Sequence, residues 1–155
     1  MARSFSTATL TVKIQEGIVL GGQNMGSLNS FSVTGIKNVV KRLMTITTTE
    51  VGILTFSSTE GQGQYIAANV RYLRITNLDD TNHIMLTFKD EDNTEFRVKV
   101  DKGQSFIYNA DISGGLVDTM KANGSALASG LADLYDVTAD ADTASCDLEI
   151  FIASV

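Results

Sequence analysis

Residue types that commonly carry out catalysis are scarce in this sequence. Its 155 residues include one histidine, His83, and one cysteine, Cys146. A serine or cysteine nucleophile needs a nearby base, and the base needs a third group to orient it. The serine of Gly124-Ser125-Ala126 does not match the Gly-x-Ser-x-Gly pattern of a nucleophile elbow. Because His83 adjoins a predicted turn and Cys146 alternates with apolar residues, we expect a surface histidine, a buried thiol and no catalytic site.

Two other groups of residues have the composition of ligand sites without their spacing. Acids concentrate in Asp90–Glu95, but the glycine and glutamate positions of an EF-hand calcium loop are missing. The glycines of Gly21–Gly26 follow a predicted strand, but no Gly-Lys-Ser/Thr ending marks a phosphate-binding loop. One histidine and one cysteine also cannot form a zinc site. We therefore predict no metal and no cofactor, with calcium binding at Asp90–Glu95, or at Asp140 and Asp142, as the alternative.

The charge is acidic and unevenly distributed. Twelve basic residues stand against 18 acidic ones, which leaves a net charge of −6. This balance argues against a protein that binds nucleic acid through its phosphates. The segment from Gly103 to Val155 contains eight acidic residues and one basic residue, Lys121. This segment is either a solvated acidic edge or one pole of a module that orients itself against a partner.

The basic residues show one concentration, which consists of Lys37, Lys41, Arg42, Arg71 and Arg74. In one interpretation these residues form the polar faces of two strands. In the other they form a partner-contact patch that faces an acidic neighbour, such as the Asp-rich C-terminal region of another copy.

Alternation of apolar and polar residues dominates the pattern and predicts strands. The predicted strands contain Leu10–Ile14, Ile18–Leu20, Phe31–Val33, Val40–Ile46, Ile53–Phe56, Leu73–Ile75, Ile84–Phe88, Phe96–Val100, Phe106–Tyr108 and Cys146–Ile152. The chain has 13 glycines and no proline, so Gly, Asn and Asp must form its turns. About eight to ten short strands predict an all-β fold, a single antiparallel β-sandwich of the jelly-roll kind over residues 1–155.

Two parts of the chain depart from this alternation. An N-terminal segment at residues 1–9 precedes the first predicted strand. The stretch Gly114–Asp136 is rich in Gly, Ala, Ser and Asp, and Leu127, Leu131 and Leu134 have helical spacing. This spacing predicts a short helix near 125–135 with Ser125 as its N-cap. The alternative is a Gly/Ala/Asp-rich loop or arm over residues 112–144.

Hydropathy excludes several classes of protein. Apolar residues make up 43% of the chain, which is too many for a disordered segment. No run of about 18 apolar residues occurs, so we expect no membrane span. The first residues lack the apolar core of a signal peptide. We therefore expect a protein that is made and kept in a cytoplasm, or that is delivered outside by assembly or lysis rather than by secretion.

Three blocks of the sequence have a distinctive residue pattern, namely Val70–Asp79, with the sequence VRYLRITNLD, Val100–Phe106, with the sequence VDKGQSF, and the C-terminal block Ala139–Ser154. Their pattern resembles that of structural proteins of tailed bacteriophages. They share residue patterning with that class of virion proteins rather than a site, so no functional residues are carried over.

The resemblance implies a small β-sandwich virion protein without enzymatic activity. It is expected to be a capsid decoration (cement) protein that binds and stabilises the shell. Its partners would be the major capsid protein or other virion proteins, and further copies of itself in a homotrimer. Residues 2–9 or the arm at 114–136 would clamp the neighbours. The alternative is a tail, neck or fibre-associated module that binds a receptor or glycan, with Tyr65, Tyr108 and Tyr135 as the aromatic candidates.

Overall fold

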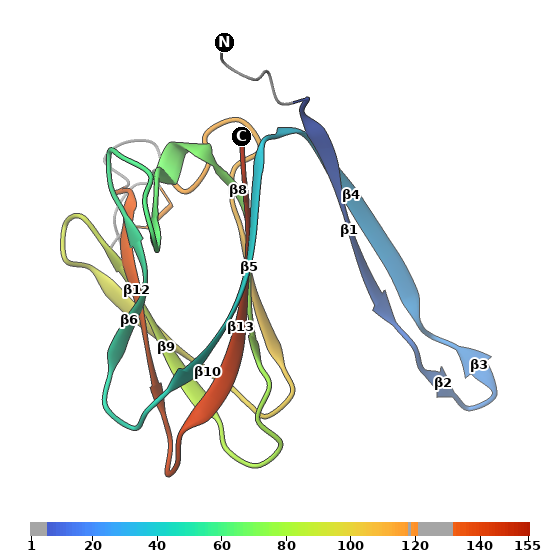
Figure 1. Ribbon diagram of the computed structural model, residues 1–155. Coiled ribbons are helices and arrows are strands. Elements are labelled where there is room, and N and C mark those ends of the chain that lie inside the picture. The colour runs from blue at the N-terminus through green and yellow to red at the C-terminus, as the bar shows by residue number, and fades with distance from the viewer. Residues whose placement is uncertain (1–5, 118, 121–131) are drawn as a thin grey trace. The chain divides into compact units, whose positions relative to one another are not determined.

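The computed structural model describes residues 6–117, 119–120 and 132–155 (Figure 1). Nearly all of the regular structure is β-strand, as expected, and the one helical element among the described residues is a single 3₁₀ turn. The elements are β1 (Ala8–Glu16), β2 (Val19–Leu20), β3 (Gln23–Asn24), β4 (Ser27–Ile36), β5 (Asn38–Ile46), β6 (Val51–Phe56), β7 (Gln64–Tyr65), η1 (Ala67–Asn69), β8 (Val70–Asn77), β9 (Ile84–Asp90), β10 (Glu95–Val100), β11 (Ser105–Asn109), β12 (Leu134–Ala141) and β13 (Cys146–Ser154).

The chain divides into two compact units, Met1–Lys37 and Asn38–Val155. The sequence predicts one sandwich over residues 1–155, whereas the sandwich occupies only the second unit. Among the described residues, β1 and β4 pair only with each other. The short strands β2 and β3, which lie between β1 and β4 in the sequence, pair with each other at the tip. The first unit is therefore a separate β-hairpin.

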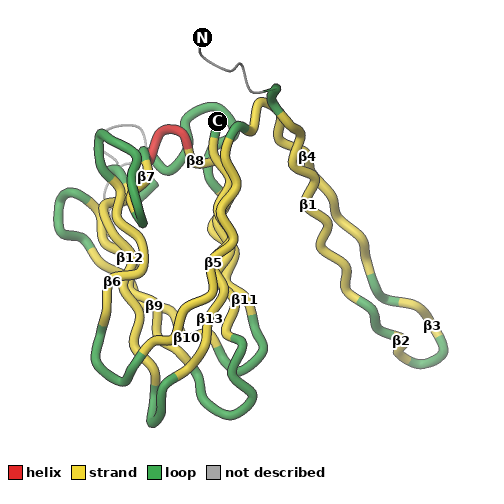
Figure 2. Tube along the Cα trace, in the orientation of Figure 1, coloured by secondary structure: helices red, strands yellow, loops and turns green. Residues whose placement is uncertain are grey.

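The second unit is a sandwich of two sheets that face each other (Figure 1). One sheet has the order β10-β9-β12-β6-β7 and the other has the order β11-β8-β13-β5. All neighbours are antiparallel except the short pair β6 and β7. The first sandwich strand, β5, and the last, β13, lie side by side, and most connections cross between the sheets (Figure 2). This is the strand order of a jelly roll, as predicted.

Strict alternation places the core between the sheets. In β9, the side chains of Ile84, Leu86 and Phe88 are fully buried, and in β13 Leu148 and Ile150 are buried in the same way. Each of these residues is separated from the next by one residue that faces the other side of its sheet. The period-two pattern of the sequence therefore defines the two inner faces, and burial of these faces provides the main stabilisation.

An aromatic cluster joins the two sheets at one edge of the sandwich. The ring of Phe88 in β9 stacks on that of Phe96 in β10, with centroids 4.8 Å apart. Across the core, Phe88 lies 5.1 Å from Phe106 and 5.3 Å from Tyr108, both in β11. Phe88 is therefore the centre of the cluster.

The segment predicted as a helix or arm ends in the sheet. Leu134–Ala141 forms β12, which lies between β9 and β6 and pairs with both. Val137 and Ala139 are fully buried and point into the core, so the strand period continues through this stretch. The expectation of a loop or arm is therefore wrong for these residues. Of the helix predicted near 125–135, residues 125–131 lie outside the described residues, and Leu134 and Tyr135 begin a strand.

The hairpin is amphipathic across its two long strands. The pairing places Leu10 opposite Val33 and Val12 opposite Phe31, which makes one face apolar. The N-terminal segment predicted at residues 1–9 overlaps β1, which begins at Ala8, and residues 1–5 lie outside the described part of the chain.

The tip of the hairpin is a tight turn between β2 and β3. Gly21 and Gly22 have φ angles of +58° and +81°, which glycine adopts at little cost. The glycines at the start of the Gly21–Gly26 segment therefore form a hairpin turn.

Candidate partner-binding surface

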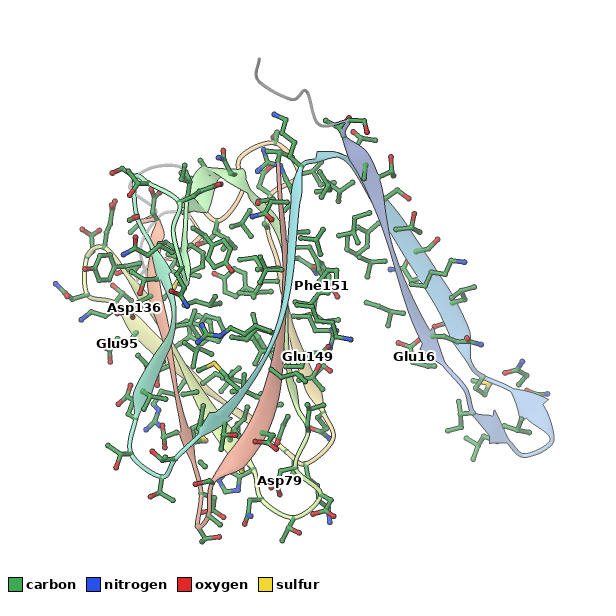
Figure 3. All side chains as sticks on the ribbon, in the orientation of Figure 1. Glu16, Asp79, Glu95, Asp136, Glu149 and Phe151 are labelled. Atoms are coloured by element: carbon green, nitrogen blue, oxygen red, sulfur yellow. The ribbon has the colours of Figure 1, made fainter. Side chains whose placement is uncertain are left out.

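Two of the five predicted basic residues lie together on the outer face of the four-stranded sheet. In the pairing of β13 with its neighbours, Phe151 is opposite Lys41 on β5 and opposite Arg74 on β8. Residues directly opposite one another in a sheet point to the same side. Figure 3 shows Phe151 and Glu149 on the side of β13 that faces away from the other sheet. The row Lys41-Phe151-Arg74 therefore crosses three strands of that face.

Glu149 sits between the two basic residues and pairs with both. Its carboxylate lies 2.6 Å from Nη2 of Arg74 and 3.3 Å from Nζ of Lys41. The hydrogen bond from Arg74 is the main reason why the pKa of Glu149 is below its ordinary value. Because the folded pKa is lowered, the stabilisation from this carboxylate is present at neutral pH and is lost as the pH falls through the acid range.

Aromatic contacts hold the same row in place. The guanidinium of Arg74 lies over the ring of Phe151, 5.8 Å from its centroid, and Tyr72 meets that ring edge-on at 5.9 Å. Such cation–π and edge contacts each add a modest stabilisation. Arg74 also donates a hydrogen bond to the hydroxyl of Thr76. With these partners Arg74 is held in one orientation, whereas Lys41 is 64% exposed.

Strand β5 adds exposed apolar side chains beside Lys41. Val39 is 50% exposed and Leu43 is 65% exposed, and they alternate with Lys41 along the strand. We call Val39, Lys41 and Leu43 the β5 strip. Since β5 is an edge strand, the strip runs along the margin of the sheet. Two apolar side chains on either side of a lysine would fit a partner surface that carries apolar side chains and one acidic group.

The other three predicted basic residues lie elsewhere. Arg42 falls on the opposite face of β5 from Lys41, since it is paired with the buried Ile150. Arg71 donates hydrogen bonds to the carbonyl oxygens of Ala68 and Val70, at 2.6 and 3.2 Å, and so supports the end of η1. Lys37 is exposed and is the single residue between β4 and β5.

The structure therefore does not gather the five residues into one patch. Adjacent residues on a strand point to opposite faces, which separates Lys41 from Arg42. Leu43 and Phe151 were not predicted as members of the patch, although each alternates with inward residues of its strand as Lys41 and Glu149 do. Only the strand pairing shows that they share a face with Lys41.

Two of the residues considered for catalysis, His83 and Cys146, lie close together. His83 Nδ1 lies 3.4 Å from Asp142 Oδ2, and the thiol of Cys146 donates a long hydrogen bond of 3.9 Å to the backbone oxygen of His83. The thiol is thus directed at the backbone and not at the imidazole. Ser125 lies outside the described residues.

Cys146 is in an environment that opposes thiolate formation. Its side chain is fully buried, and burial, followed by the nearby carboxylates of Asp79, Asp142 and Asp147, raises the pKa of the thiol. Since the thiolate is the reactive form, this environment makes the thiol inert.

We expect Cys146 to react with a thiol reagent such as iodoacetamide about 100-fold or more slowly in the native protein than in the unfolded chain. Mass spectrometry of samples quenched over time, with and without denaturant, gives the two rates. Equal rates would show that the thiol is accessible in the native state.

The acidic groups considered for calcium mostly have protein partners. Asp90 accepts a hydrogen bond of 2.7 Å from the backbone N–H of Thr94, which closes the β9–β10 turn. Asp140 pairs with Arg97. Within residues 6–117, 119–120 and 132–155, no three His, Cys, Asp or Glu side chains are grouped as metal ligands.

One cavity of about 330 Å³ lies where β12 begins. Tyr135, Glu91 and Asp133 are among its lining residues, with Ser57 and Ser58 on another part of its wall. Tyr135 is 49% exposed, whereas Tyr65 is buried and Tyr108 belongs to the aromatic cluster. Tyr135 and Tyr108 each line a cavity of about 330 Å³, and Tyr135 is the more exposed of the two.

The chain was compared with known proteins in three ways. Protein-family models, curated sequences and solved structures gave no match. Among the described residues, no helix has the length and apolar character needed to span a membrane.

Proposed function

We propose that this protein is a non-enzymatic structural protein of a virion, and that it decorates a capsid shell by binding and stabilising the major capsid protein. In this proposal the β5 strip and the adjoining row Lys41-Phe151-Arg74 contact the shell, and copies of the protein associate as a homo-oligomer, a trimer at a local symmetry axis.

The observation that carries the proposal is the grouping of exposed large apolar side chains. Val39 and Leu43 lie on the β5 strip, and a second group lies at the hairpin tip. Grouped apolar exposure on a rigid protein marks interaction surfaces. The resemblance of Val70–Asp79 and the C-terminal block to phage structural proteins supports a virion protein as the partner.

The jelly-roll fold suits this role. Jelly rolls occur in viral capsid proteins, lectins and enzymes, so the fold alone does not identify the function. A lattice offers many identical sites, and a small decorating protein gains avidity when several of its copies bind together.

Binding to purified expanded capsids tests the proposal. We expect the protein to co-sediment with capsids and to raise their resistance to heat. Cryo-electron microscopy of decorated particles should show many copies on the shell, in the hundreds by lattice symmetry. Absence of binding, or density confined to the tail or neck, would rule out the decoration role.

Two surface variants test whether the β5 strip is the part of the protein that binds the capsid. Leu43→Glu replaces an exposed apolar side chain of the β5 strip with a charge, and we expect it to weaken capsid binding by about tenfold or more. Lys99→Glu on β10 serves as a control, because Lys99 is exposed on the other sheet. The proposed surface is wrong if both variants bind like the unaltered protein.

A second candidate function is glycan binding by a tail or fibre module. The cavity beside Tyr135 favours it, because sugars stack on exposed aromatic rings and hydrogen-bond to neighbouring carboxylates and hydroxyls. A glycan array decides this case. A hit that Tyr135→Ala abolishes would support glycan binding, and an array without hits would remove it.

A further inference from the structure

The tip of the hairpin exposes an unusual number of large apolar side chains. Within one short stretch, five such residues are more than half exposed, namely Ile18 at 53%, Val19 at 71%, Leu20 at 68%, Met25 at 61% and Leu28 at 63%. Isolated exposed apolar residues are ordinary, but a contiguous group marks an interaction site.

The same part of the chain carries no charge. Residues 17–36, which we call the neutral segment, contain no Asp, Glu, Lys, Arg or His, although the whole chain has 12 basic and 18 acidic residues. Contact between identical segments across a symmetry axis places like residues near one another at the axis, so a charge close to the axis would repel its own copy. A neutral segment avoids this repulsion and suits contact with a second copy.

Strand β4 supports the same partner through its backbone. It has ten residues, and its only strand partner among the described residues is β1. Its other edge therefore presents backbone N–H and C=O groups that another strand can pair with.

The edges of the sandwich are protected in ways that β4 is not. Edge strand β10 carries Glu95, Arg97 and Lys99, and edge strand β5 carries Lys41 and Arg42. The other two edges, β7 and β11, are only two and five residues long. Charges and short length both discourage pairing with another chain. β4 is the long edge without a charge.

We propose that the neutral segment is a self-association site, at which the hairpin tip and the free edge of β4 contact the neutral segment of a second copy. The inference deepens the homo-oligomer part of the proposed function and names the element that makes the contact. It is independent of the shell, since self-association is measured in the purified protein.

Opposite charges at one position test the contact. Leu28 lies in β4, is 63% exposed, and is opposite the uncharged Gln15. We expect Leu28→Lys and Leu28→Glu each to raise the dissociation constant for self-association by about tenfold or more, measured by sedimentation velocity. An equal mixture of the two variants should associate more strongly than either alone, because the opposite charges then meet across the contact. Recovery in the mixture cannot result from misfolding.

Leu43→Glu is the matched control, because Leu43 is 65% exposed but lies on β5, outside the neutral segment. It should self-associate like the unaltered protein while binding capsids weakly, and the Leu28 variants should show loss of self-association.

The inference is overturned if the unaltered protein is monomeric at its highest soluble concentration. It is also overturned if the Leu28 variants associate normally, or if mixing them restores nothing. A protein that self-associates through Leu28 but never binds capsids would contradict the decoration role and leave the self-association site intact.

Discussion

Replacing Phe88 with alanine is expected to destabilise the protein by about 3–5 kcal/mol, the usual cost of removing a buried phenylalanine ring. Phe88 is fully buried, and its ring contacts Phe96, Phe106 and Tyr108. These neighbours come from both sheets, so the cavity left by the substitution would lie between the layers. For a chain of this length, each kcal/mol lowers the melting temperature by about 2–4 °C.

Phe96→Ala is the control for this prediction. Phe96 stacks on Phe88 but is 37% exposed, so solvent can fill part of the space that its ring leaves. We expect a loss of about 1–2 kcal/mol, less than half of the effect at Phe88. Differential scanning calorimetry or urea unfolding measures both. Equal losses for the two variants would mean that Phe88 is not the centre of the cluster.

Replacing Gly115 with alanine is expected to cost about 3–5 kcal/mol through strain, a lost hydrogen bond and lost burial combined. Gly115 has a φ angle of +75°, and a Cβ atom there would lie 2.3 Å from the carbonyl oxygen of Ala67. The backbone must then move away from η1. This movement would break the hydrogen bond of 2.8 Å from Leu116 N–H to Ala67 and withdraw the fully buried Leu116 side chain.

Gly103→Ala separates the steric clash from the backbone conformation. Gly103 also has a positive φ, +70°, but nothing lies within 4 Å of its potential Cβ. We therefore expect a cost of only about 1–2 kcal/mol at Gly103, from the left-handed conformation alone. Urea unfolding of the two variants side by side gives the difference. If Gly115→Ala is no worse than Gly103→Ala, the close approach to η1 is unimportant for stability.

The β-sandwich could be predicted because its strands are half-buried. When one face of a strand packs and the other meets solvent, the sequence must alternate, as in Ile84, Leu86 and Phe88. Asn and Asp residues, which favour turns, also occupy the turn between β8 and β9. The structure adds that the Asn77 side chain is fully buried and donates hydrogen bonds to the carbonyl oxygens of Asn82 and Val100.

The candidate surface could be predicted only in part. Local spacing identified Lys41 and Arg74 as members of a basic group, but it also included Arg42 and Arg71, which the strand geometry directs elsewhere. Glu149, the acid that pairs with Lys41 and Arg74, is far from both in the sequence. Pairing between distant strands decides which side chains meet, and a single sequence contains no direct record of register.

The amino-acid sequence alone determined the all-β class of this protein, the jelly-roll-like sandwich and the inward positions of most strands, because burial of alternate residues requires an alternating pattern. Only the tertiary structure separated the hairpin from the sandwich, since a hairpin strand and a sandwich strand have the same period. The tertiary structure also assigned Leu134–Ala141 to the middle of a sheet. Two alanines and two aspartates weaken the strand preference of this segment, and pairing with β6 and β9 decides its conformation.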